Sequence, residues 1–199
     1  MSVRTYSKAR DGGKKLSVHF AVREFACNDG SDQVLISEEL VTLLQKIRDH
    51  FGAPVVINSA YRTQAYNAKV GGAARSQHLL GTAADITLAG VTPLEVAQYA
   101  EFLQPKAGGI GVYQTFTHVD VRASRCRWDS RSGKETVVSG WPGYTEAVLP
   151  TEAELAVEWI TAQGILRGDG GDLMLDKPLT RRQAAVVLHR LARLLGRAT

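Results

Sequence analysis

The clearest periodic pattern in the chain is an amphipathic helix that follows Ser37. Apolar side chains recur there at intervals of three and four residues, at Leu40, Val41, Leu44, Ile47 and Phe51. Ser37 is a suitable N-cap, and Gly52 followed by Pro54 gives a stop signal. We therefore expect one helix between Ser37 and Gly52, with its apolar face turned to a core.

Further helices and short strands are predicted on both sides of that helix. In TPLEVAQYAEFL, Thr92 and Glu95 form a capping box and Pro93 takes the first helical position. A short helix is expected from about Thr63 to Val70. Strand patterns occur in the segments PVVINSAYR, AADITLAG, GGIGVY and TFTHVDVR. Because helices and strands alternate without a regular βαβ rhythm, the predicted class is α+β, with a small mixed or antiparallel sheet flanked by helices.

The pattern changes after Trp128. Residues 129–150 are polar, contain Gly and Pro and show no sustained period, so they are predicted to be a linker. Residues 151–199 contain two helical segments, one capped by Thr151 with Glu154 and one capped by Thr180 with Gln183. We therefore expect a domain over 1–128, a linker, and a C-terminal helical hairpin module.

Composition and charge exclude only a few classes of function. The 199 residues carry a formal charge of +4 and a pI near 9.2, which suits an anionic partner such as a cell-wall polymer. No Lys/Arg tract with interleaved aromatics favours nucleic acid, and no apolar run suits a signal peptide or a membrane span. The expectation is a chain made in the cytoplasm that binds neither nucleic acid nor membrane. Cys27 and Cys126 lack metal-site spacing and are expected to be ordinary thiols, with one disulfide as the minor alternative.

Three residues could hold a catalytic metal ion. A catalytic zinc site takes three protein ligands, often imidazole or carboxylate, and leaves one position for water. His78 and Asp85 lie in SQHLLGTAAD, and His118 lies in TFTHVD. Each also has a structural interpretation, since a strand histidine is more often a satisfied core residue and Asp85 could form a salt bridge or cap a turn. On its strand, His118 shares a face with Asp120 and Arg122.

These motifs together resemble a known enzyme family. The pattern Ser-x-His-x-x-Gly-x-Ala-x-Asp begins at Ser76, a Tyr-Arg pair precedes it at Tyr61 and Arg62, and a strand histidine follows at His118. This combination resembles the zinc D-Ala-D-Ala carboxypeptidases, including the L-alanyl-D-glutamate peptidases of phage endolysins. The resemblance covers roughly Leu16 to Trp128.

The resemblance implies roles for the matching residues. His78, Asp85 and His118 would bind one zinc ion per chain. Arg62 would face a substrate carboxylate or the polarised carbonyl oxygen, and Ser76 and Tyr61 would help to bind substrate. Arg62 could instead be a surface residue that caps the following helix.

The chain departs from the family at the general base. Many members have an acid three positions before the last zinc ligand, where this chain has Thr115. Asp120 is the nearest acidic substitute. It could activate water, orient a zinc ligand, or pair with Arg122.

The C-terminal module resembles a single S-layer homology repeat. The matching features are Trp159, Gly164-Ile165, Gly168-Asp169, Pro178 and the cap that starts at Thr180. By this resemblance, residues 151–199 would bind an anionic secondary wall polymer, with Arg181 contributing. A hairpin that serves self-association is the alternative.

The sequence as a whole predicts an endolysin-like zinc peptidase that reaches the bacterial cell wall and cuts a peptide bond in the stem peptide of peptidoglycan. The specific bond stays open: it would be a D-Ala-D-Ala bond, an L-Ala-D-Glu bond or a cross-bridge. The main alternative is a non-catalytic, zinc-stabilised protein that binds the wall or builds a phage particle. A nucleic-acid-binding protein that uses the basic last helix is a weaker third hypothesis.

Overall fold

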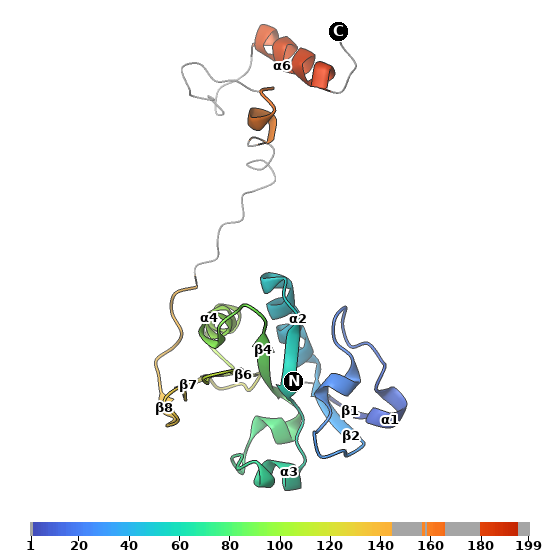
Figure 1. The fold of residues 1–199 in the computed structure, drawn as a ribbon, viewed down its shortest axis with the longest axis vertical. Coiled ribbons are helices and arrows are strands. Elements are labelled where there is room, and N and C mark those ends of the chain that lie inside the picture. The colour runs from blue at the N-terminus through green and yellow to red at the C-terminus, as the bar shows by residue number, and fades with distance from the viewer. Residues whose placement is uncertain (1, 145–156, 158, 166–179, 195–199) are drawn as a thin grey trace. The chain divides into compact units, whose positions relative to one another are not determined.

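The computed structural model describes residues 2–144, 157, 159–165 and 180–194. The chain divides into two compact units, Met1–Tyr144 and Thr145–Thr199, which are considered separately. The predicted α+β class is confirmed in the first unit, where a mixed sheet is flanked by helices (Figure 1).

Six strands form the main sheet, in the order β3-β4-β6-β5-β7-β8. Their bounds are β3 Val55–Ser59, β4 Ala83–Leu88, β5 Gly109–Val112, β6 Thr117–Asp120, β7 Cys126–Asp129 and β8 Thr136–Val137. All neighbours are antiparallel except β5 and β7, which run parallel. The four strands expected from sequence, β3 to β6, are all present.

One row of residues crosses five neighbouring strands of this sheet, from β3 to β7. Asp85 of β4 pairs with His118 of β6, which pairs with Gly111 of β5. The row continues to Trp128 of β7 on one side and to Ser59 of β3 on the other. Residues directly opposite each other in neighbouring strands point to the same face, so the side chains of this row gather on one face of the sheet.

Two helices cover the opposite face. Helix α2 spans Glu38–Phe51 and helix α4 spans Pro93–Leu103, and α4 contacts β5 and β6. Figure 1 shows both helices on one side of β4 and β6, with α3 (Gln64–Lys69) on the other. The core between the helices and the sheet is built from alternating strand residues, among them Ile86, Ile110 and Val119. This packing leaves the face that carries His118 free for polar groups.

The helix signals in the sequence are confirmed. Ser37 accepts a hydrogen bond from the Leu40 backbone N–H, and Gly52 ends α2 in the left-handed conformation with φ 60°. Thr92 and Glu95 form the expected capping box of α4. Each cap satisfies backbone donors that the helix itself leaves unpaired.

Smaller elements complete the unit. Strands β1 (Val3–Ser7) and β2 (Gln33–Ser37) pair antiparallel in a separate sheet. Helix α1 spans Lys8–Asp11, and the short 3-10 helices η1 and η2 span Val22–Phe25 and Gln77–Leu80. Element η2 carries His78 and therefore belongs to the candidate site.

The structure differs from the expected linker over residues 129–144. Strand β8 pairs with β7, so this part of the chain closes a hairpin on the edge of the sheet. Trp141 is buried in the hydrophobic core, and its indole N–H donates to the carbonyl oxygen of Ile110. The physical reason is that a tryptophan and two short β-pairs anchor a polar segment whose composition alone indicates a loop. Residues 145–150 lie outside the described residues.

In the second unit, helix α6 spans Arg181–Leu194 and is capped as expected, with the Thr180 hydroxyl accepting from the Gln183 backbone N–H. Residues 159–162 are helical, and Gly164 follows them with φ 66°. The capping box expected at Thr151 and the connection over 166–179 lie outside the described residues, so the hairpin stays a prediction.

Two further expectations concern the whole described chain. None of its described helices is long and apolar enough to cross a membrane. Cys27 and Cys126 are both free thiols.

Candidate metal centre

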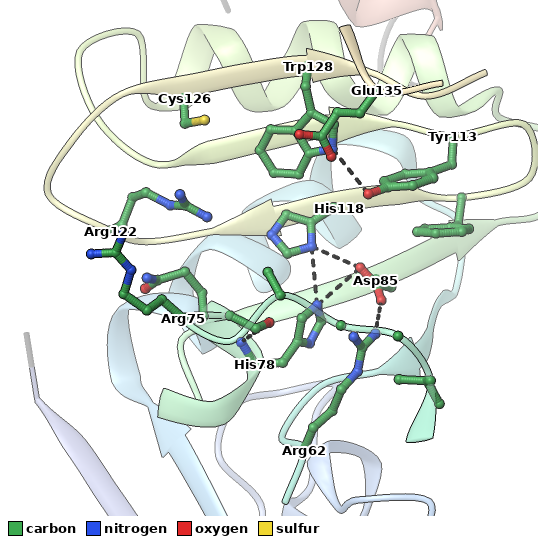
Figure 2. Close-up of a pocket in the computed structure, with 17 residues that line it drawn as sticks. Arg62, Arg75, His78, Asp85, Tyr113, His118, Arg122, Cys126, Trp128 and Glu135 are labelled. Carbon is green, nitrogen blue, oxygen red and sulfur yellow. Dashed lines mark hydrogen bonds and ion pairs between the residues drawn. The ribbon is translucent and has the colours of Figure 1, made fainter. Parts of the chain in front are cut away.

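His78, Asp85 and His118 converge on one point above the sheet. Their ligand atoms lie within 4.8 Å of one another, and all three residues are buried. His118 Nδ1 is 2.9 Å from Asp85 Oδ1 and 3.2 Å from His78 Nε2, and His78 Nε2 is 3.3 Å from Asp85 Oδ1. The structure thus brings together the three residues that the sequence nominated as metal ligands (Figure 2).

The local fold explains how these side chains meet. Asp85 and His118 are cross-strand partners on β4 and β6, whereas His78 comes from η2. Ser76 begins η2 by accepting a hydrogen bond from the His78 backbone N–H, and Gly81 ends it with φ 68°. In addition, a side chain on Gly81 would collide with the backbone of Leu35, because its Cβ would lie 2.3 Å from that carbonyl oxygen. Glycine at this position lets the chain turn tightly from η2 into β4.

The spacing suits a small tetrahedral ion. Zinc bonds to histidine nitrogen and carboxylate oxygen are about 2.0–2.2 Å long, which puts tetrahedral ligand atoms roughly 3.3–3.6 Å apart. Two of the three separations, 3.2 and 3.3 Å, are close to that range, and the third is 2.9 Å. Two imidazoles and one carboxylate are also the donor types that zinc binds at catalytic sites. The donor set therefore fits this metal.

Hydrogen bonds select the nitrogen that each histidine offers. His78 Nδ1 lies 2.7 Å from the carbonyl oxygen of Ala60, which can only accept, so Nδ1 carries the proton and Nε2 is left to bind metal. On the other ring, His118 Nε2 lies 3.1 Å from Asp120 Oδ2, and Nδ1 faces the cluster. Each ring is thus held by an acceptor on the side away from the ligand atoms, as is usual for metal-binding histidines.

The charges in the cluster favour a cation. Burial alone would lower the pKa of His118, but hydrogen bonds and the charges of Asp120 and Asp85 outweigh it and raise the pKa to about 9. Burial would likewise raise the pKa of Asp85, yet hydrogen bonds from His118 and His78 hold it well below its ordinary value. For His78, burial is the largest influence and lowers the pKa. The carboxylates therefore stay ionised and place negative charge around the point where a metal ion would sit.

Asp120 is committed to its neighbours on the sheet. Its side chain is fully buried, and besides facing His118 it accepts hydrogen bonds from the Gly109 backbone N–H and from Arg122. Burial would raise its pKa, but the bonds to His118 and Arg122 keep the pKa far below normal. Of the three roles left open by the sequence, this geometry matches ligand orientation and pairing with Arg122. Asp120 does not line the cavity described below.

Arg62 is held in the same way by the carboxylate ligand. Its Nη2 donates to Asp85 Oδ2 at 2.5 Å, and its Nε donates to Ser59 Oγ at 2.8 Å. The guanidinium therefore holds Asp85 by the oxygen that does not face the histidines. Because these bonds occupy two of its donors, Arg62 orients a ligand in this structure, although it also lines the cavity.

Glycines in β5 make room for this arrangement. A Cβ at Gly109 would lie 2.2 Å from Asp120 Oδ2, and a Cβ at Gly111 would lie 2.2 Å from the Trp128 ring. Both glycines sit on the same face as His118, since they are two residues apart and Gly111 is its cross-strand partner. The alternation in GGIGVY is thus a requirement of the site, a signal that was not used in predicting it.

A cavity of about 660 Å³ opens over the cluster. His78, Asp85, His118, Arg62 and Ser76 line it, as the sequence led us to expect. Tyr61 lies elsewhere, because its ring is buried in the hydrophobic core, where burial raises the pKa of its hydroxyl. Tyr61 therefore belongs to the core and does not line the cavity.

The lining residues that were not nominated from the sequence include Arg75, Tyr113, Trp128 and Glu135. Trp128 lies against His118, with ring centroids 5.0 Å apart, and its indole N–H donates to the Tyr113 hydroxyl. The Tyr113 ring in turn stacks on Phe116 at 4.2 Å. Figure 2 shows Glu135 next to Trp128, in the part of the view away from Arg62. Tyr113, Trp128 and Glu135 thus form one side of the cavity (Figure 2).

Comparison with known proteins supports an enzymatic assignment for this centre. Residues 14–120 match the family model described as Peptidase M15, a span that includes all three candidate ligands. A search of curated proteins gave no match.

Proposed function

The chain belongs to the peptidase M15 family and is a zinc metallopeptidase directed at peptidoglycan, and within that family we propose that it hydrolyses a peptide bond of the stem peptide. The observation that carries the proposal is the convergence of His78, Asp85 and His118 at the floor of an open cavity. When bound, zinc polarises a carbonyl oxygen and lowers the pKa of a water molecule towards about 7. The chain's own residues orient the ligands and handle the substrate.

Asp120 and Arg62 act as positioning residues in this proposal. Asp120 fixes the His118 ring through Nε2, and Arg62 fixes Asp85 through Oδ2. Such outer contacts keep the ligands in place without reorganisation when substrate arrives. Asp120 and Arg62, for which the sequence suggested catalytic roles, therefore contribute through the ligands that they hold.

Glu135 is proposed as the general base. The family's usual acidic position is Thr115 in this chain, and a threonine cannot serve as that base. Asp85 and Glu135 are the carboxylates that line the cavity, and Asp85 is engaged by both histidines and by Arg62. Glu135 is exposed on the segment between β7 and β8 and reaches the cavity from the side of Trp128. It would accept a proton from the attacking water and return it to the leaving amine.

Tyr113 is proposed to stabilise the negative oxygen that develops on the scissile carbonyl. An indole N–H can only donate, so Tyr113 accepts from Trp128 and keeps its own proton for another acceptor. The hydroxyl lines the cavity, and the stacked Phe116 ring holds it in place. A fixed donor of this kind acts on the transition state at little reorganisation cost.

The C-terminal unit is proposed to hold the enzyme at the wall by binding an anionic polymer. Arg181 begins helix α6, next to the Thr180 cap, and is exposed. An endolysin-like role, in which the enzyme reaches peptidoglycan during cell lysis, is consistent with this arrangement. Removal of residues 145–199 should reduce sedimentation with purified walls, whereas cleavage of a soluble stem peptide should persist.

The test of the proposed function is digestion of purified peptidoglycan, with products identified by mass spectrometry. Native, zinc-stripped and zinc-restored protein are compared with His118→Ala and with the control His19→Ala. His19 contacts Gln45 away from the cavity, so its loss should leave the activity intact. The expected result, which identifies the bond, is zinc-dependent release of one defined peptide set that is lost in His118→Ala and retained in His19→Ala. Tight zinc binding without products would contradict hydrolysis.

A further inference from the structure

Three guanidinium groups line the cavity, and two of them are already paired. Arg62 donates to Asp85, and Arg122 donates to both carboxylate oxygens of Asp120, from Nε to Oδ1 and from Nη2 to Oδ2. Arg75 is exposed and has no ion-pair partner among the described residues. The charges of Arg62 and Arg122 are thus matched by carboxylates of the protein, whereas that of Arg75 is not.

The loop that carries Arg75 is fixed on both sides. The buried Asn67 side chain donates to the carbonyl oxygen of Ala73 at 3.0 Å, and Gly72 packs so closely on Asn67 that a Cβ there would lie 2.1 Å from its Oδ1. On the other side, Ser76 caps η2. Because the backbone is held between Gly72 and Ser76, Arg75 is presented at the cavity at a reduced entropic cost of binding.

From this unpaired charge we propose that Arg75 binds a carboxylate on the leaving-amine side of the cleaved bond. This inference rests on the proposed function and deepens it. In a D-Ala-D-Ala terminus the residue after the scissile bond has a free α-carboxylate, and so does the D-glutamate of an L-Ala-D-Glu bond, which continues through its side chain. Arginine suits such a group, since its planar fork matches a carboxylate in two parallel hydrogen bonds.

The position of Arg75 is compatible with this role. Arg75 adjoins Ser76 and lies three residues before His78, so a group held by Arg75 stays close to the metal ligands. Figure 2 shows Arg75 and Arg122 on one side of the ligand cluster, with Tyr113 on the other. A substrate that spans the cluster would then place its carboxylate at Arg75 and its reacting carbonyl near Tyr113.

The experiment pairs a substitution with a chemical change in the substrate. Native protein, Arg75→Gln and Arg75→Lys are each given two synthetic stem peptides that differ only in whether this carboxylate is free or amidated. The native enzyme should prefer the free carboxylate by about 10- to 100-fold in kcat/KM, the worth of a charge-assisted contact. Arg75→Gln should lose that preference by reacting more slowly with the free carboxylate alone, and Arg75→Lys should recover part of it.

A control variant and a binding measurement distinguish failure of the carboxylate site from failure of the proposed hydrolysis. Arg23→Gln removes the same charge from an exposed arginine of η1 that does not line the cavity, and it should preserve the preference. Calorimetry with the two peptides measures the same preference as affinity in the zinc-loaded protein, whether or not cleavage occurs. If Arg75→Gln still discriminates between the peptides, the inference is overturned. If the preference depends on Arg75 in binding but no variant cleaves, the carboxylate site stands and the proposed hydrolysis fails.

Discussion

The Trp128 indole N–H donates to the Tyr113 hydroxyl oxygen at 3.1 Å, and this bond decides what the tyrosine can do. With its oxygen occupied as an acceptor, the hydroxyl proton is directed to a different partner. Trp128 also packs against His118, so the donor stands close to a metal ligand. Trp128 of β7 therefore contacts both the proposed hydrogen-bond donor and a metal ligand.

Replacing Tyr113 with phenylalanine tests this link. Tyr113→Phe keeps the ring that stacks on Phe116 and removes the hydroxyl, so kcat should fall on the order of 100-fold, as for loss of one oxyanion donor. KM and zinc affinity should change little. Steady-state kinetics on a synthetic stem peptide measures both parameters, with Tyr6→Phe of β1 as a control distant in the sequence and outside the cavity. An unaltered kcat would remove Tyr113 from the reaction.

Loss of the Asp120 carboxylate should weaken metal binding. In Asp120→Asn the contact with His118 Nε2 is no longer charged, and zinc affinity should fall roughly 10- to 100-fold. Competition with a chromophoric chelator gives the dissociation constant, and thermal melting of the metal-free protein reports folding. Arg122→Gln removes the other partner of Asp120 but keeps the contact with His118, so its effect on affinity should be smaller. Equal zinc affinity in Asp120→Asn and native protein would contradict the positioning role.

Glu135→Gln separates catalysis from metal binding. The amide cannot accept a proton, so kcat should drop by about 100-fold or more while zinc affinity stays at the native value. Asp129→Asn is the matched control, because Asp129 lies on the same hairpin but pairs with Arg131 outside the cavity. Full activity in Glu135→Gln would leave the general base to another group.

Alanine at Gly111 should disturb the site through the sheet. The added methyl would overlap the Trp128 ring, and such overpacking costs about 1–3 kcal/mol of unfolding free energy. Urea unfolding should show this loss, along with reduced activity, because Trp128 must move. Gly13→Ala adds a methyl with no heavy atom within 4 Å and should be tolerated. If both variants were equally stable, the close packing of Gly111 would not be a constraint.

A buried ion pair behind the sheet should make stability depend on acid. Burial would raise the pKa of Glu101, but hydrogen bonds from Arg127 and Arg125 lower it overall. A depressed folded-state pKa adds stability above the unfolded value, near 4.3, and this stability is lost as pH falls through the folded value. Glu101→Gln leaves the fully buried Arg127 without its carboxylate, so it should cost roughly 3–5 kcal/mol at pH 7. Denaturation at a series of pH values should show the gap narrowing below about pH 4; a constant gap would contradict the assignment.

The helices and central strands could be predicted because their signals are local. Ser37 and Gly52 bound α2 by their own conformations, and the β-branched run at Val55 marks β3 without reference to the rest of the chain. Strands β7 and β8 could not be found in this way. They are short and polar, and they form because Trp128 and Trp141 pack on residues brought from far along the chain.

The residues of the site also differ in whether a local signal could predict them. The spacing of Ser76, His78 and Asp85 lies within one sequence motif, so the resemblance could nominate these residues. The contacts of Arg62 and Asp120 depend on cross-strand neighbours, which decide whether a charged group faces substrate or holds a ligand. Glu135 lay in a segment expected to be a linker, and only the β7–β8 hairpin brings it to the cavity.

The row that runs from Ser59 through Asp85, His118 and Gly111 to Trp128 builds the centre from five neighbouring strands of the sheet. Side chains alternate between faces, so inserting or deleting one residue within β4 or β6 would turn Asp85 or His118 from the site face toward the hydrophobic core. Evolution or engineering can therefore vary the loops at the strand ends, but the strands themselves must keep their length parity. In this protein the alternation of side chains along the strands keeps the metal ligands on one face of the sheet.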